Sequence, residues 1–210
     1  MIKILIADDH PLVREGLKKI LKDESDMEVQ FEARNSQEVL EFIEGHDLDA
    51  VVMDISMPGK SGLDALKEIR QRFPKLPILF LSMHPEDRFA VRAIRLGAAG
   101  YLTKESAPRE LVKAIRKVVR GGKYITQTVA EKLALEVEAA TEKPIHETLS
   151  DREFQILCLI ASGKSVKVIA GELSLSTHTV NTYRARILEK MSMKTNVDLT
   201  QYAIRNRLVD

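Results

Sequence analysis

The stretch ILIADDHPLVREGL, residues 4–17, decides the fold class. Its first part belongs to an apolar run, Ile2–Ala7, which is typical of a buried β-strand. Two carboxylates, Asp8 and Asp9, follow at once, and Pro11 then stands where the first turn of a helix accepts a proline. The stretch therefore predicts a strand, an acidic turn and a helix in direct succession.

The same alternation continues to about residue 120. Strands are expected at Ile2–Ala7, Val29–Ala33, Ala50–Met53, Ile78–Leu81 and Gly100–Leu102. Helices are expected on the apolar stripes that begin at Val13, Val39, Leu63, Ala90 and Leu111. The runs at 50–53 and 78–81 are apolar throughout, as strands covered on both faces should be. This order predicts an α/β fold, a doubly wound five-stranded parallel sheet.

Residues 149–210 show no strand pattern. Ser150 and Glu153 have the spacing of a capping box, and Ser165 and Ser176 can each cap a further helix. A fourth helix is expected over Val197–Arg207. The sequence thus predicts a larger α/β domain at 1–122, a linker with one short helix at 123–146, and a smaller all-α domain of four helices at 147–210.

Composition excludes several classes of protein. No apolar run approaches the ~20 residues of a membrane span, so no membrane association is expected. The chain has a single cysteine, Cys158, which cannot form an internal disulfide and fits a cytoplasmic location. Residues 147–210 hold nine basic and seven acidic side chains, and this weak excess alone does not indicate DNA binding.

Five polar residues lie at the expected strand ends. They are Asp8, Asp9, Asp54, Ser82 and Lys104. Ligands of a parallel sheet gather beyond the carboxyl ends of its strands, so these side chains should share one crevice. Clustered carboxylates need a cation, and an all-oxygen set suits Mg²⁺, while a lysine and a hydroxyl suit a phosphoryl group. The pattern predicts phosphoryl transfer onto a carboxylate.

Four segments resemble the receiver domain of response regulators, which has a flavodoxin-like fold. They are ILIADDHPLVREGL, VVMDISMPGKSGLDAL, LFLSMHPED and GAAGYLTKESAPREL. The resemblance implies that Asp54 accepts phosphate from a sensor histidine kinase. It further implies a Mg²⁺ site made by Asp9, Asp54 and the backbone carbonyl of Ser56, with Asp8 acting through water.

The same resemblance assigns roles on the other side of the crevice. Ser82 and Lys104 would contact the phosphoryl group. Tyr101, three residues before Lys104, matches the switch aromatic of the family; the alternative is an ordinary aromatic inside a strand.

The C-terminal segments LSDREFQILCLIASGKS, IAGELSLSTHTVNTYRARILEKM and VDLTQYAIRNRLV resemble the LuxR-type helix-turn-helix domain of NarL/FixJ regulators. A plain helical hairpin is the alternative for two helices joined by a short turn. With the receiver, the resemblance covers nearly the whole chain.

A helical wheel divides the third of these helices into two faces. Val180, Ile187, Leu188 and Met191 form the face expected to be buried. On the opposite face Thr182 and Ala185 suit a thymine methyl group, and Asn181 on its flank suits adenine. Phosphate contacts are expected from His178, Tyr183, Arg186 and Lys190. Ala185 replaces a lysine found in many relatives, and Arg184 is expected to pair with Glu153 or Glu172.

Two rival functions remain in view. An aspartyl-phosphate phosphatase also uses a carboxylate and Mg²⁺, but its two aspartates are normally separated by one residue after the first strand. A receiver could also have a protein-binding output. The family instead implies a transcription regulator that is no enzyme with a separate substrate. Its partners would be promoter or operator DNA, RNA polymerase, and a second copy of the chain when phosphorylated.

Overall fold

The computed structural model describes residues 1–83, 86–138, 144–206 and 208–209. The chain folds into two compact units, Met1–Lys132 and Leu133–Asp210. Among the described residues, no helix combines the length and the apolar character that crossing a bilayer requires.

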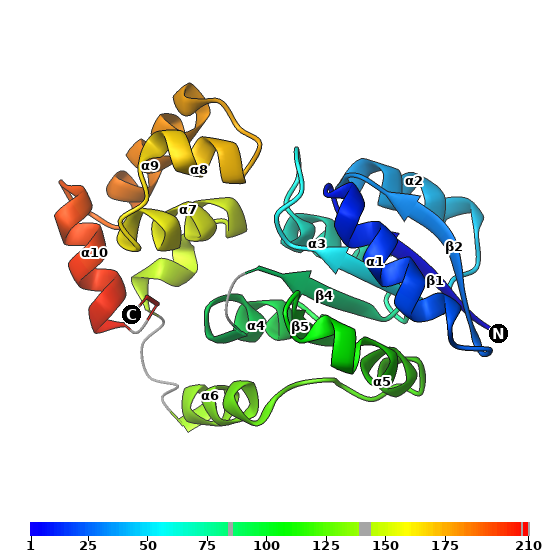
Figure 1. Ribbon diagram of the computed structural model, residues 1–210. Coiled ribbons are helices and arrows are strands. Elements are labelled where there is room, and N and C mark those ends of the chain that lie inside the picture. Colours follow the sequence, from blue (N-terminus) through cyan, green and yellow to red (C-terminus); the bar gives the residue numbers. More distant parts are fainter. Residues whose placement is uncertain (84–85, 139–143, 207, 210) are drawn as a thin grey trace. The chain divides into compact units, whose positions relative to one another are not determined.

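The first unit is built on a five-stranded parallel sheet with the strand order β2-β1-β3-β4-β5 (Figure 1). Its strands are β1 (Ile2–Ala7), β2 (Met27–Ala33), β3 (Ala50–Asp54), β4 (Ile78–Ser82) and β5 (Gly100–Thr103). The helices that alternate with them are α1 (Pro11–Lys22), α2 (Ser36–Gly45), α3 (Gly62–Arg72), α4 (Glu86–Arg95) and α5 (Ala107–Val119). The expected doubly wound sheet is confirmed.

Side chains of the central strands alternate between two packed faces. Ile4 and Ile6 of β1 join a buried cluster with Leu17 of α1 and Leu111 of α5. Leu5, between them, is equally buried but lies outside this cluster, because successive strand residues point to opposite faces. Both faces are therefore covered by helices, and their side chains hold the strand ends in fixed positions.

Three strands, β3, β4 and β5, end one residue later than their apolar pattern predicts. Asp54 ends β3 and pairs with Leu81, and Ser82 ends β4 and pairs with Thr103. A polar residue can continue a strand when its backbone still has a neighbour to bond. Asp54 and Ser82 are thereby part of the sheet itself.

The loop between β3 and α3, residues 55–61, folds back on the end of β3. The Gly62 N–H donates to the carbonyl of Ile55 at 2.9 Å, and a Cβ on Gly62 would lie 2.4 Å from the Asp54 carbonyl oxygen. Only glycine permits this close approach. The Ser36 hydroxyl donates to the Lys60 carbonyl at 2.8 Å and ties the loop to α2.

The segment after α5 lies along β5. The Tyr124 N–H donates to Ala99 O at 2.8 Å, and the Lys123 ammonium donates to Ala98 O at 2.6 Å. The Tyr124 side chain is part of the same buried cluster as Leu111. The helix expected in this region is α6 (Gln127–Glu138). Within the expected linker at 123–146, residues 139–143 lie outside the described part of the chain.

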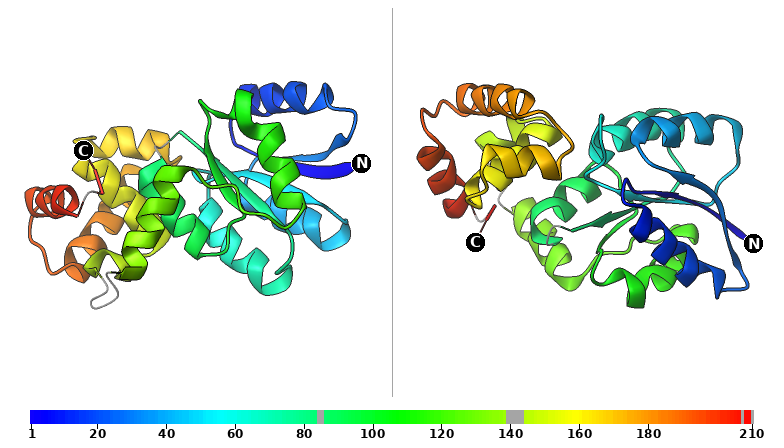
Figure 2. Two further views of the ribbon diagram at one scale, coloured as in Figure 1. Left: turned by 90° about the horizontal axis from the view of Figure 1, so that it is seen from below. Right: turned by 45° about the horizontal axis from the view of Figure 1, so that its top comes forward.

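Helices form the second unit as far as its residues are described, and Figure 2 gives two further views of them. They are η1 (Ile145–Thr148), α7 (Asp151–Ala161), α8 (Val166–Glu172), α9 (Thr177–Lys190) and α10 (Asn196–Arg205). The capping box of Ser150 and Glu153 and the caps Ser165 and Ser176 are present as expected. The short 3₁₀ helix η1 was not anticipated. A second capping box, Thr195 with Asp198, starts α10 one residue earlier than expected.

Candidate functional site

Three polar side chains meet at the carboxyl edge of the sheet. Lys104 extends its ammonium group to two carboxylates, at 2.8 Å from Asp54 Oδ2 and 2.6 Å from Asp8 Oδ2. Asp8 is 1% exposed and Asp54 is 2% exposed. The structure therefore brings these three strand-end residues together, with Lys104 between the two carboxylates.

Burial and charge act against each other in this cluster. Burial raises the pKa of the Asp54 carboxyl, and the neighbouring Asp8 adds to this, although Lys104 and the Ser56 N–H oppose it. For Lys104, burial lowers the pKa, but the two carboxylates outweigh that effect and leave it raised. The ammonium therefore stays charged, whereas Asp54 holds its negative charge less firmly than an exposed aspartate.

One backbone N–H donates to the Asp54 carboxylate, and a second backbone bond joins the segments that carry Ser82 and Lys104. The Ser56 N–H donates to Asp54 Oδ1 at 3.2 Å, and Lys104 N donates to the Ser82 carbonyl at 2.8 Å. Ser82 is fully buried at the end of β4. Ser56 thus lies against the Asp54 carboxylate, and Ser82 follows Leu81, the residue that pairs with Asp54 across the sheet.

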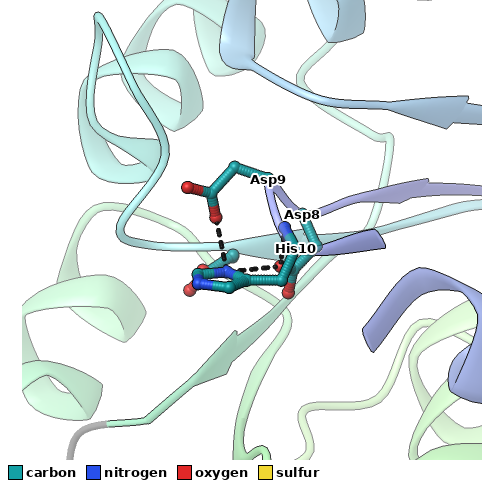
Figure 3. Close-up of side chains that lie close together, drawn as sticks. Asp8, Asp9 and His10 are labelled. Carbon is teal, nitrogen blue, oxygen red and sulfur yellow. Dashed lines mark hydrogen bonds and ion pairs between the residues drawn. The ribbon is translucent and has the colours of Figure 1, made fainter. Parts of the chain in front are cut away.

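Asp9 and His10 complete the acidic end of the crevice (Figure 3). The His10 ring places Nδ1 at 2.8 Å from Asp9 Oδ1 and at 3.3 Å from Asp8 Oδ1. One ligand atom from each of Asp8, Asp9, His10 and Asp54 lies within 4.8 Å of the others.

The donor set fits a divalent cation. Asp9 Oδ1 is buried and accepts no hydrogen bond of good geometry, although the His10 ring lies 2.8 Å away. The Lys104 ammonium meets Asp8 Oδ2, but its single positive charge cannot balance the carboxylates of Asp8, Asp9 and Asp54 together. Oxygens that are buried, anionic and not hydrogen-bonded are costly unless a cation meets them. Receiver domains generally bind Mg²⁺, and this cluster could hold such an ion.

Arg14 is a site component that the sequence reading missed. Its side chain is buried, and Nη1 donates to the Asp8 carbonyl at 2.6 Å. Nε lies 3.5 Å from Glu32 Oε2. A signal was available, because Arg14 precedes Leu17 and Leu21 by three and seven residues, the spacing of the buried helix face. The guanidinium fixes the backbone turn that presents the two carboxylates.

Tyr101 occupies a buried position in β5, 1% exposed, and pairs with Phe80 of β4. This is the residue that matches the switch aromatic of the family, and in the present conformation its ring is buried.

In the second unit, α8 and α9 are joined by a turn of four residues, Leu173–Ser176. Ser174 adopts a φ of 51°, and the buried Arg152 donates to the Leu173 carbonyl at 2.9 Å. This arginine was not singled out from the sequence. Its contact fixes the turn and hence the angle between the two helices.

The helix α9 has the two expected faces. Val180, Ile187 and Met191 are buried and Leu188 is half-buried. The residues expected to contact DNA are His178, Asn181, Thr182, Tyr183, Ala185, Arg186 and Lys190, and all are exposed except the half-buried Tyr183. Lys190 is also engaged within the unit, with Nζ at 2.6 Å from Glu153 Oε2.

The expected pairing of Arg184 is wrong. Glu153 is paired with Lys190 and Glu172 with Lys164, while Arg184 Nε donates to Asn196 Oδ1 at 2.5 Å. The wheel placed Arg184 near the apolar stripe, but the start of α10 supplies a neutral acceptor there. A contact between separate helices is not visible in the periodicity of one.

Comparison with known proteins gives the same two parts. The chain matches the family model described as "Response regulator receiver domain" over residues 4–116 and that of "Bacterial regulatory proteins, luxR family" over residues 147–203. It is 39% identical to the response regulator UvrY of Escherichia coli, covering 99% of this chain and 96% of UvrY. It is 38% identical to the response regulator GacA of Pseudomonas aeruginosa, covering 100% and 99%.

The solved structures that resemble the chain include RcsB from Salmonella enterica serovar Typhimurium. One contains promoter DNA and the phosphomimetic BeF₃⁻, with a TM-score of 0.60 and 28% identity over 96% of this chain and 97% of RcsB. Another contains two RcsB dimers on two parallel DNAs, again with a TM-score of 0.60, 28% identity and 96% coverage of each chain. The chain therefore belongs to the NarL/FixJ family of response regulators, transcription regulators that join a receiver domain to a LuxR-type DNA-binding domain.

Proposed function

We propose that a sensor histidine kinase phosphorylates Asp54 in a Mg²⁺-dependent reaction, and that this controls dimerisation and sequence-specific DNA binding. The observation that carries the proposal is the buried carboxylate of Asp54, which lies 2.8 Å from the Lys104 ammonium at the sheet edge.

In this proposal an Asp54 oxygen attacks the phosphorus atom as the bond from phosphorus to the donor's histidine nitrogen breaks. Lys104 and Ser82 then neutralise and hydrogen-bond the new phosphoryl oxygens. Asp9, Asp54 and the Ser56 carbonyl would hold Mg²⁺ directly, and Asp8 would hold it through water. The bound ion would supply positive charge against the phosphoryl oxygens.

The DNA-binding part of the proposal rests on α9. Asn181, Thr182 and Ala185 would contact base edges, and His178, Tyr183, Arg186 and Lys190 would contact phosphates. Lys190 would exchange Glu153 for a phosphate. RcsB, to which the chain is similar, has been solved as dimers on DNA, which supports a dimer on two half-sites here. RNA polymerase would be a further partner at such promoters.

The phosphorylation step can be tested on the full-length protein with Mg²⁺ and a small phosphodonor. Intact-mass spectrometry should show one added phosphoryl group, lost in Asp54→Asn. Asp47→Asn, a change at an exposed aspartate near the amino end of β3, is the matched control and should remain labelled. Labelling of Asp54→Asn at another aspartate would refute the assignment.

A further inference from the structure

His10 adds the only nitrogen to the group of four ligand atoms within 4.8 Å of one another, the other three coming from Asp8, Asp9 and Asp54. Its ring contacts both neighbouring carboxylates, at 2.8 Å and 3.3 Å. The side chain is 64% exposed, so an ion arriving from solvent can reach it. Figure 3 shows the ring beside both carboxylates, with a dashed line from one ring nitrogen to each.

Among the described contacts, none shows the His10 ring stabilising the helix that it precedes. His10 is the N-cap residue of α1, but its side chain forms no capping hydrogen bond. The contact that shapes the turn comes from the backbone, where His10 N donates to Asp8 Oδ1 at 2.9 Å. Replacing the imidazole should therefore leave the turn intact.

A mixed donor set changes which metals a site prefers. Mg²⁺ favours oxygen ligands and keeps its waters, whereas imidazole is a strong ligand for Co²⁺, Cu²⁺ and Zn²⁺. We propose that His10 supplies a nitrogen ligand to the acidic cluster, so that the receiver binds first-row transition-metal ions at the place where Mg²⁺ acts. This inference rests on the proposed Mg²⁺ site.

The consequence is competition between metals. An ion held by Asp9, Asp54 and His10 would occupy the acceptor carboxylate with a different geometry from Mg²⁺. His10 would thus set the metal selectivity of the site. The competing explanation is that His10 only offsets the negative charge of Asp8 and Asp9. In that case removing it should tighten the binding of every divalent cation, Mg²⁺ included.

The test is calorimetric titration of untagged full-length protein with MgCl₂ and, separately, CoCl₂, at one fixed pH. We expect His10→Ala to weaken Co²⁺ binding by roughly tenfold or more, the scale on which losing even an outer partner of a metal ligand acts. Mg²⁺ affinity should be unchanged. His46→Ala is the matched control, since this exposed histidine bonds the Phe42 carbonyl and lies outside the cluster.

A spectroscopic readout accompanies the titration. Cu²⁺ bound to the wild type and to His46→Ala should show nitrogen hyperfine coupling in its electron paramagnetic resonance spectrum, and His10→Ala should lose that coupling. Unchanged Co²⁺ affinity in His10→Ala, or an equal change for Co²⁺ and Mg²⁺, would overturn the inference.

Asp9→Asn distinguishes a failure of the proposed Mg²⁺ site from a failure of the proposed role of His10. It should weaken both Mg²⁺ and Co²⁺. If neither ion responds to Asp9→Asn, the proposed Mg²⁺ site fails and the inference fails with it. If Asp9→Asn weakens the binding of both ions but His10→Ala does not change the ratio of Co²⁺ to Mg²⁺ affinity, only the inference about His10 fails.

Discussion

The ammonium of Lys104 lies 2.8 Å from Asp54 Oδ2, although fifty residues separate the two in the sequence. The pairing of β3, β4 and β5 sets this distance, since both residues stand at the carboxyl ends of strands. The cation that would meet an added phosphoryl oxygen is therefore already beside the acceptor. It also contacts Asp8, so a single positive charge is shared by two buried carboxylates and the cluster keeps a net negative charge.

Lys104→Met should destabilise the receiver unit. Removing one partner of a buried ion pair typically costs about 3–5 kcal/mol, because the remaining charges are left unpaired. Added Mg²⁺ should recover part of the loss, since it can neutralise the same carboxylates. Urea unfolding with and without Mg²⁺ measures both effects.

The pH dependence of that variant follows from the raised pKa of Asp54. As the pH falls and Asp54 takes up a proton, the pair with Lys104 loses its attraction in the wild type. The stability difference between wild type and Lys104→Met should therefore shrink toward acid pH. A difference that stays constant from neutral to acid pH would contradict the ion-pair assignment. Lys75→Met, at an exposed lysine, is the control.

Gly62→Ala should distort the loop after β3. Its methyl group would lie 2.4 Å from the Asp54 carbonyl oxygen and 3.0 Å from Ile55 Cα, both backbone atoms that cannot move aside cheaply. We expect a loss of about 1–3 kcal/mol, as for overpacking in a core, together with slower phosphorylation. Gly16→Ala on α1 has open space around it and should be harmless. Equal stability of the two variants would disprove the steric explanation.

The sequence was sufficient for the sheet because apolar runs and caps are local signals. The same holds for the strand-end residues Asp54, Ser82 and Lys104, since parallel strands bring their carboxyl ends to one edge. The sequence did not predict Arg14 and Arg152 as site residues, because each donates a hydrogen bond to a backbone carbonyl outside its own helix. The partner of a long side chain depends on how segments pack, and periodicity carries no such information.

Glu153 gives the second unit a pH-dependent contribution. Burial raises the pKa of this carboxyl, but the bonds from Lys190 and Ser150 outweigh burial and lower it. A lowered pKa means that the stabilisation is present above the ordinary value of 4.5 and is lost as the pH falls through the folded-state pKa. In Lys190→Met the loss of melting temperature relative to wild type should be largest near neutral pH and should fade in acid. A melting-temperature difference that grows in acid would contradict this pairing.

Substitutions on α9 should divide into two classes. Asn181→Ala, at a proposed base contact, should cost about 1–3 kcal/mol and relax preference at one base pair. Arg186→Ala should weaken binding to all sequences and reduce the salt dependence by about one phosphate contact. Titrations at several salt concentrations on specific and scrambled DNA distinguish these effects. Arg205→Ala, at an exposed arginine on α10, is the control. Identical behaviour of the two α9 variants would defeat the assignment of roles.

The most direct measurement compares DNA affinity with and without phosphodonor, for wild type and Asp54→Asn, on a two-half-site operator and on a single half-site. Coupling two recognition helices in one dimer can raise affinity by ~10²–10⁴ through effective concentration. We predict that phosphorylation tightens wild-type binding to the two-half-site DNA far more than to the half-site, with light scattering showing a dimer, and that Asp54→Asn does not respond. Equal affinity in both states, or a phosphorylated protein that stays monomeric on the two-half-site DNA, would contradict the proposed control of DNA binding by Asp54.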